Sequence, residues 1–475
     1  MIERTLSSFL TRHAAAGAIV RFDHPVDPRS NLAAVGWRCR NDLIKGSLFE
    51  HVDGSPDWRV ATQFLRTRDD WQALFGLSRE NCLFDLRDRA RLRVAPVAVK
   101  DAGLNARRTA GPDLDQLPMP VLCAADAGVR SATAVLVLGG GEPLLGLARV
   151  QLGDTGRLAI GCEAHEVVQR LNSARAGGSR LRAALVLGAH PSLYLAAAMA
   201  GSGQQGGYAL AGALLGEAIR TCTGEHGLPL PADAECVLEG TIDAATDATL
   251  AGLGETPGTR AEPGSGWWFS QETLRHRKDP VFWSLQTGAP IGDAGVLQAM
   301  ATEIIVAEHL RNVEGGLDLI DVRCPAEAGN LIVIVKLRGR IDGQTKTALM
   351  AALSSPALLP KFAIGVDEDV DVDDLRDVGW SMASRTHAAT DVTLIEGMWM
   401  HPNDLVSPQE AGSGMMMDRI GTKWLFDSTM PALTQPNLRE AYERAIPRNL
   451  NKIILDDYLP RDRAPRSKQS GKTAN

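Results

Sequence analysis

The middle of this chain consists of short β-type runs that are separated by glycine-containing turns. Two adjacent runs, residues 131–138 and 144–152, flank the glycines at 139–141. Three further runs cover residues 156–162, 183–189 and 234–243. Such a series predicts a curled sheet or a small barrel. The three glycines lack the further glycine and the helix of a dinucleotide-binding fingerprint, so we expect a hairpin turn there.

Helix and strand patterns alternate on both sides of this β-rich region. Before it, apolar periodicity predicts a helix over 6–16 and a strand over 18–22, and after it a helix over 297–312 and a strand over 361–366. A connection rich in proline, glycine and polar residues covers 106–121. We expect an α/β (α+β) multidomain protein with four parts: an N-terminal α/β domain (1–115), a central β domain (116–295), a C-terminal α/β domain (296–460) and a flexible tail (461–475).

Charge and cysteine usage exclude several classes of protein. The chain has 475 residues and a formal net charge of -7, which disfavours a nucleic-acid partner because such binding needs a concentrated basic face. Its seven cysteines are scattered and never form a C-x-x-C pair, so neither a disulfide framework nor a zinc site is indicated. A reducing compartment fits this usage best.

No stretch of the sequence has the pattern of a signal peptide or a membrane span. Charged side chains interrupt the first twenty residues, and His190 and Pro191 interrupt the most apolar stretch, which covers residues 183–201. We expect a cytoplasmic protein without membrane contact.

Several separated segments resemble blocks of the UbiD-like family of decarboxylases, in the order of that family. They include DLDQLPMPVLCAADAG, LLGLARVQL, LVLGAHPSLYLAAAMA, ECVLEGTIDA and LRHRKDPVFW, then VDEDVDVDDLRDVGWSMASRTHAATDV and TKWLFDSTMP. The resemblance covers nearly the whole chain. It implies an N-terminal α/β domain, a central split β-barrel domain that binds a flavin, and a C-terminal α/β domain that mediates oligomer contacts.

The resemblance also implies a cofactor and partners. The cofactor is prenylated FMN, which a flavin prenyltransferase supplies and which binds with a divalent metal (Mn or Mg) and often K+. The substrate is a small carboxylic acid, and the expected assembly is a homodimer or homohexamer.

Arg149 and Glu255 are the candidate catalytic residues. Arg149 stands in an apolar strand, so its guanidinium must meet an anion, either in a structural ion pair or in an active site. The resemblance assigns it to the substrate carboxylate and to a glutamate, which its planar fork can hold bidentately. Glu255 matches a family glutamate that returns a proton to the carbon that lost carbon dioxide, although a glutamate in a glycine-rich loop is more often only solvated.

The Glu255 loop also departs from the family pattern. Leu250 stands where the family has its first glutamate, and Asp243 and Asp247 lie upstream as possible substitutes. Three explanations stay open: Glu255 acts alone, the chemistry is a variant, or the chain is a degenerate subunit.

The resemblance assigns the remaining site residues to the cofactor. His165 and Glu217 match metal ligands near the flavin phosphate, and Leu144 replaces the third ligand, an asparagine. Lys423 matches a lysine near the phosphate, with an exposed strand-end lysine as the alternative. For His165 the alternative is an ordinary hydrogen-bonded histidine.

Two further clusters have ordinary explanations. The acidic run at 367–374 lacks the glycine and the final glutamate of an EF-hand loop and is typical of a helix start. An aromatic group could line a pocket, although core packing is commoner for such residues. Its members are Trp267, Trp268, Phe269 and Trp283.

Two functions follow from this reading. The first is a reversible, non-oxidative decarboxylase of an aromatic, heteroaromatic or α,β-unsaturated acid that uses prenylated FMN. The second is a non-catalytic or scaffold subunit of a multi-subunit carboxylase, motivated by Leu250 and Leu144.

Overall fold

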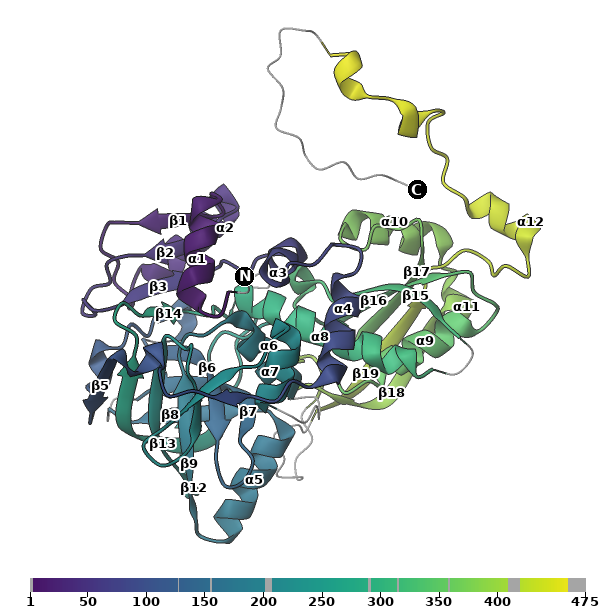
Figure 1. Cartoon of the computed structure of the whole chain (residues 1–475). Helices are drawn as coiled ribbons and strands as arrows, with labels where there is room; N and C mark the ends of the chain where they lie inside the picture. The colour runs from purple at the N-terminus through teal and green to yellow at the C-terminus, as the bar shows by residue number, and fades with distance from the viewer. Residues whose placement is uncertain are drawn as a thin grey trace.

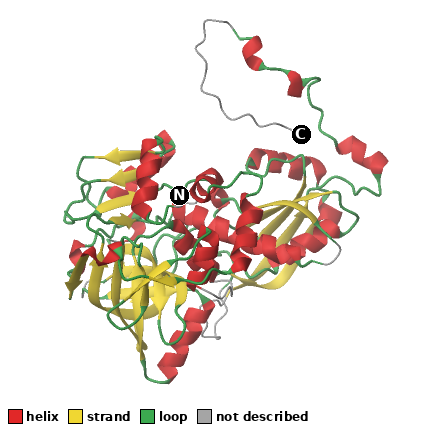
Figure 2. Ribbon diagram, viewed as in Figure 1, coloured by secondary structure: helices red, strands yellow, loops and turns green. Residues whose placement is uncertain are grey.

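The computed structural model describes residues 3–126, 128–153, 156–200, 207–288, 292–313, 316–357, 359–408 and 419–459. Figure 1 shows a barrel beneath a small N-terminal sheet on one side and a C-terminal sheet with its helices on the other. Figure 2 shows the helices gathered between these groups of strands. The predicted tail at 461–475 lies outside the described residues.

The central sheet closes into an antiparallel barrel. Its order is β12-β9-β6-β7-β8-β13, and β13 pairs back with β12 to close the ring. A β-bulge shifts the β12–β13 register at Gly240. A Cβ at this position would lie 2.0 Å from the Ser270 carbonyl oxygen, so only glycine fits. The barrel strands are β6 (Arg130–Leu138), β7 (Leu144–Leu152), β8 (Leu158–Cys162), β9 (Arg180–Val186), β12 (Cys236–Leu250) and β13 (Gly264–His276).

The hairpin that joins β6 and β7 turns at the predicted glycines. Gly140 and Gly141 have φ values of 90° and 137°, a region that side chains with a Cβ rarely adopt. The hairpin prediction is therefore confirmed. The strands pair over their whole length, which places Arg149 on β7 opposite Thr133 on β6, while β8 places Gly161 on the other side of Arg149.

The N-terminal part is a mixed four-stranded sheet that borrows a strand from later in the chain. The order is β1-β2-β3-β14, and β14 comes from the end of the central segment. In return β5 pairs with β13 of the barrel. The elements here are α1 (Leu6–Ala15), β1 (Ile19–Phe22), α2 (Leu32–Leu43), β2 (Gly46–Phe49), β3 (Arg59–Thr62), α3 (Arg68–Phe75), α4 (Cys82–Leu92), β4 (Val97–Ala98), β5 (Arg107–Ala110) and β14 (Val281–Trp283).

Helices and a small sheet connect the barrel to this part. Helix α5 packs on the barrel strand β12, whereas α6 and α7 pack on each other and on β7. Their bounds, with those of the small sheet β11-β10-β4, are α5 (His165–Ala176), α6 (Pro191–Ala200), α7 (Gly207–Leu215), β10 (Arg220–Thr223) and β11 (Pro229–Pro231).

The C-terminal part is a five-stranded sheet of order β15-β16-β17-β19-β18. The inner strands β16, β17 and β19 are parallel, as expected for strands joined through helices. The elements are β15 (Asp318–Arg323), β16 (Ile332–Arg338), α9 (Gln344–Leu353), β17 (Phe362–Asp367), α10 (Leu375–Arg385), α11 (Ala388–Asp391), β18 (Val392–Met400), β19 (Arg419–Asp427) and α12 (Pro436–Arg439).

One buried helix, α8 (Asp293–Arg311), joins the parts. It contacts α4, α6, α9 and β15, and Figure 1 shows it at the centre of the molecule. The largest apolar core runs through it, from Phe9 near the N-terminus to Leu425 on β19. Burying a helix nearly all round accounts for its weak amphipathic pattern.

These observations confirm the predicted α/β multidomain class with a central barrel. The acidic run at 367–374 does end at a helix start, because Asp374 caps α10 and its side chain accepts from the Arg376 N–H. All seven cysteines are free thiols. Among the described helices, all are too short or too polar to traverse a lipid bilayer.

Candidate active site

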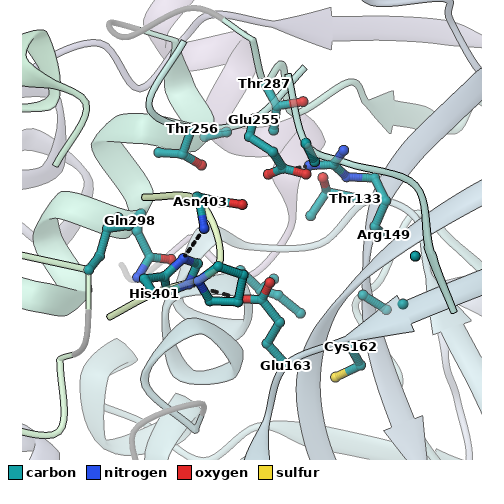
Figure 3. Close-up of a pocket in the computed structure, with 18 of the residues that line it drawn as sticks. Thr133, Arg149, Cys162, Glu163, Glu255, Thr256, Thr287, Gln298, His401 and Asn403 are labelled. Carbon is teal, nitrogen blue, oxygen red and sulfur yellow. Dashed lines mark hydrogen bonds and ion pairs between the residues drawn. The ribbon is translucent and has the colours of Figure 1, made fainter. Parts of the chain in front are cut away.

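A cavity of about 560 Å³ lies where the barrel meets α8 and the C-terminal part. Its volume falls in the range of small-molecule and cofactor pockets. The barrel contributes β7 and the end of β8, the N-terminal turns of α8 contribute Ala294 and Leu297, and the C-terminal part contributes His401 and Arg419. Residues from different parts of the chain thus share one concave surface (Figure 3).

Arg149 and Glu255 form an ion pair inside this cavity. Arg149 Nη2 lies 3.0 Å from Glu255 Oε2, and Nη1 donates to the Gly254 carbonyl oxygen at 3.4 Å. Their side chains are only 17% and 20% exposed. The structure therefore brings the two predicted catalytic residues together, and the alternative of a merely solvated Glu255 is wrong.

The loop that carries Glu255 is held by backbone contacts. The Gly288 N–H donates to the Glu255 carbonyl oxygen at 3.0 Å, and the Gly254 N–H donates to Asp126 Oδ1 at 3.1 Å. A Cβ on Gly254 would stand 2.7 Å from Cys123 Sγ, so a glycine is needed for this close approach. The carboxylate is thus aimed at Arg149 by a loop with little freedom.

Burial raises the pKa of Glu255 above the ordinary carboxyl value. The positive charge of Arg149 opposes this shift, and the carboxylate of Glu163 adds to it. A carboxyl group with a raised pKa keeps its proton to higher pH, which suits a proton donor.

A second pair of side chains, Glu163 and His401, lies in the same cavity and was not predicted. His401 Nε2 lies 3.3 Å from Glu163 Oε2, and the Asn403 N–H donates to His401 Nδ1 at 3.1 Å (Figure 3). Because Nδ1 accepts this hydrogen bond, the ring proton lies on Nε2 and faces Glu163. The pair joins the barrel to the C-terminal part.

The charges of this pair shift both pKa values. Burial acts to raise the pKa of Glu163, but the attraction of His401 outweighs it, so the pKa lies below the ordinary carboxyl value. For His401, burial acts to lower the pKa and Glu163 reverses the sign, so the pKa is raised. The pKa values of Glu163 and Glu255 therefore shift in opposite directions, which is typical of paired acids with different roles.

The sequence contained one signal for Glu163. It follows the apolar strand β8 directly and stands two residues beyond Gly161, the strand partner of Arg149. For His401 the sequence offered none, because its approach to the barrel depends on how the C-terminal part packs.

The predicted metal ligands do not converge. Glu217 pairs with Arg4, with Arg4 Nη2 2.5 Å from Glu217 Oε2, and His165 is exposed at the first position of α5. The described residues contain no group of three or more His, Cys, Asp or Glu side chains that could hold a metal ion. These residues do not fit a divalent metal.

Lys423 lies outside the cavity that holds Arg149 and Glu255. It lies on β19, is 2% exposed and donates to the Leu353 carbonyl oxygen at 2.9 Å, and it does not line the cavity. The alternative of an exposed lysine is wrong. Burial lowers the pKa of Lys423 to about 8.

The other candidates are structural. Asp243 and Asp247 pair with Arg180 and Arg175 and do not line the cavity, so neither substitutes for the acid missing at Leu250. The core explanation holds for the aromatic residues that are buried, Trp267, Phe269 and Trp283. Trp268 instead packs against the Arg157 guanidinium, 4.3 Å from its ring centroid.

The cavity combines apolar surface with an unpaired hydroxyl. Apolar side chains such as Leu147, Leu250 and Leu297 offer surface for a flat ring. Thr287 Oγ1 is buried and has no hydrogen-bond partner among the described residues, so this cavity-lining hydroxyl fits a polar group of a bound molecule.

Comparison with known proteins agrees with these features. Three segments match 3-octaprenyl-4-hydroxybenzoate carboxy-lyase, in the order of its N-terminal domain (residues 10–90), Rift-related domain (97–290) and C-terminal domain (296–427). The chain is 26% identical over 465 residues to a phenolic acid decarboxylase of Sedimentibacter hydroxybenzoicus, which covers 92% of this chain and 94% of the relative. It is 27% identical to a phenolic acid decarboxylase of Streptomyces sp. (strain D7), over 90% of this chain and 92% of the relative.

A solved structure shares the fold. The UbiD-class enzyme HmfF from Pelotomaculum thermopropionicum, in complex with FMN, superposes with a TM-score of 0.84 and 24% identity, over 96% of this chain and all of that one. Because the family matches span all three parts of the chain, the chain belongs to the UbiD family of carboxy-lyases.

Proposed function

We propose that this protein decarboxylates an aromatic carboxylic acid in the cavity that holds Arg149 and Glu255. The observation that carries the proposal is the ion pair between these two side chains inside a pocket of about 560 Å³. The relatives that act on phenolic acids support an aromatic substrate. Heteroaromatic and α,β-unsaturated acids share the same planar carboxylate and stay within the proposal.

Arg149 would bind the substrate carboxylate. Its Nη2 already meets a carboxylate oxygen at 3.0 Å, and the planar guanidinium has further N–H groups for a second anion. Held in this way, the bond to the departing carboxylate is oriented inside the cavity.

Glu255 would supply the proton that replaces carbon dioxide. Burial keeps its pKa raised, so the protonated form persists to higher pH than for an exposed glutamate. As the substrate loses carbon dioxide, the Glu255 carboxyl group donates its proton to that carbon, and water returns a proton to Glu255 afterwards. The same groups serve carboxylation in reverse, so we propose a reversible reaction.

The proposed cofactor is prenylated FMN, supplied by a flavin prenyltransferase. When bound, the flavin provides the acceptor for electron density while the carbon–carbon bond breaks. The cavity lining at Thr287, Leu147 and Leu297 would hold it. The described residues do not fit a divalent metal beside it.

Turnover by the flavin-loaded protein tests this proposal. The protein is co-produced with a flavin prenyltransferase, and release of carbon dioxide from a panel of aromatic acids is measured. Arg149→Ala should abolish turnover, whereas Arg107→Ala, which removes an exposed arginine of β5, should not. Full turnover by Arg149→Ala would remove the site assignment.

A second function, a scaffold subunit of a multi-subunit carboxylase, is favoured by one observation. Leu250 lines the cavity where the family has an acid, and neither Asp243 nor Asp247 lines it. Absorption spectra discriminate between the two: bound oxidised flavin with turnover supports the enzyme, and a flavin-free protein after co-production supports the scaffold.

We also propose a homo-oligomer, either a dimer or a hexamer, and the domain limits 1–115, 116–295 and 296–460. Support for assembly comes from apolar side chains that stay exposed on the C-terminal sheet and on the segment after it. They include Leu394, Trp399, Trp424, Ile446, Leu450, Ile454 and Leu455.

A further inference from the structure

Glu163 is a carboxylate with one oxygen that faces the cavity. Half of the Glu163 side-chain surface is exposed, although protein surrounds the side chain on most sides. The exposed half faces the cavity that Glu163 lines. Its Oε2 meets His401, and within the described part of the chain no second donor contacts the carboxylate. A carboxylate in such a place accepts hydrogen bonds from whatever occupies the cavity.

His401 fixes the direction of this carboxylate. Nε2 faces Glu163 at 3.3 Å, and the opposite ring nitrogen, Nδ1, accepts the Asn403 N–H at 3.1 Å. The imidazole is therefore held from both ends, and its proton points at Glu163. Figure 3 shows His401 beside Glu163, with both apart from Arg149 and Glu255 in the same cavity.

Two of the charged groups that line the cavity, Arg149 and Glu163, have opposite character. Arg149 provides N–H donors for an anion, whereas Glu163 provides an acceptor that repels one. A substrate with a carboxylate at one end can satisfy both only if its other end carries a hydrogen-bond donor. An ether or a bare ring would offer Glu163 no donor beyond His401, at a cost in affinity.

We propose that Glu163 is a specificity-determining residue that accepts a hydrogen bond from a ring hydroxyl of the substrate, and that His401 is its positioning residue. This inference rests on the proposed function only for the identity of the bound acid. It goes beyond that function because it assigns recognition of the ring hydroxyl to Glu163 and fixes which end of the acid faces Arg149.

Binding measurements on the flavin-loaded protein test the inference without requiring turnover. The probes are 3- and 4-hydroxybenzoate with their methyl ethers, which keep the ring oxygen and lose the donor. We expect at least one hydroxylated acid to bind roughly 10- to 100-fold more tightly than its ether, the range for a hydrogen bond to a charged group. Glu163→Leu should bring this ratio close to 1, while Glu163→Gln should retain an intermediate ratio because its amide oxygen still accepts.

Glu166→Leu is the matched control. It removes an equal charge three residues away, in the first turn of α5, and does not line the cavity. The ratio should stay unchanged in this variant. His401→Ala should lower the ratio by releasing Glu163, and His401→Gln, which keeps an N–H donor, should restore part of it.

Three results would overturn the inference. One is equal binding of each hydroxylated acid and its ether by the wild-type protein. Another is an unchanged ratio in both Glu163 variants. The third is a loss of flavin from these variants without a change in the ratio, which would assign Glu163 to the cofactor. If the hydroxylated acid binds selectively but is never decarboxylated, the inference stands and the proposed function fails. If the acid is decarboxylated but binds no more tightly than its ether, the proposed function stands and the inference fails.

Discussion

Replacing Arg149 by methionine should destabilise the protein more at alkaline than at acidic pH. The methionine keeps the apolar stem but leaves Glu255 without its cation. Removing one partner of a fully buried pair costs about 3–5 kcal/mol, and an exposed pair is worth about 0–1 kcal/mol. With exposures of 17% and 20%, the pair lies between these limits, so we expect a loss of about 2 kcal/mol when Glu255 is ionised.

The sign of the pH effect follows from the raised pKa of Glu255. The folded protein holds this proton more tightly than the unfolded chain, so the associated stability is complete below the ordinary carboxyl pKa and is lost as pH rises through the raised value. Arg149 limits that loss by stabilising the carboxylate. Without Arg149 the loss is larger, so the variant suffers most above the Glu255 pKa.

Urea denaturation at pH 5 and pH 8 measures this difference. The free energy of unfolding of Arg149→Met, relative to wild type, should be lower at pH 8 than at pH 5 by about 2 kcal/mol. In the Glu255→Gln background, which has no ionisable group at this position, the difference between the two pH values should vanish. An equal effect of Arg149→Met at both pH values would refute the electrostatic reasoning.

Three further predictions concern the site and the assembly. Glu255→Gln should lower kcat with little change in KM, and wild-type activity should fall as pH rises through the raised Glu255 pKa, which a pH–rate profile checks. Gly254→Ala should reduce turnover because its Cβ would stand 2.7 Å from Cys123 Sγ, whereas Gly379→Ala, whose Cβ meets nothing within 4 Å, should leave kinetics unchanged. Deleting residues 433–475 should lower the mass seen by light scattering if the exposed apolar residues of that segment hold the oligomer together, and an unchanged mass would exclude this.

Much of the fold could be read from the sequence because it depends on local patterns. The alternation of residues 131–138 and 144–152 about three glycines specified the β6–β7 hairpin, since strand period and turn conformation are properties of neighbouring residues. The exchange of β14 and β5 between the two sheets could not be read in this way, because strand pairing across more than a hundred residues leaves no local signal.

The site residues also differ in whether local sequence patterns could predict them. Arg149 and Glu255 were each noticeable as charges in apolar or glycine-rich surroundings, and their pairing at 3.0 Å agrees with the expectation. The assignments of Lys423, His165 and Glu217 rested on short motifs, and the folded chain places Lys423 in the C-terminal core and Glu217 against Arg4. A short motif gives the type of a residue but not the direction in which the backbone presents it.

By itself the sequence determined the family, the barrel strands and the two charges that face each other in the cavity, because these follow from local periodicity and ordered motifs. Only the tertiary structure decided what completes the cavity. Packing of the C-terminal sheet on α8 brings His401 to within 3.3 Å of Glu163, and no local rule connects residues 238 positions apart. Coulombic and hydrogen-bonding forces act over a few ångströms of space, so chemistry of this kind appears only once the chain has folded.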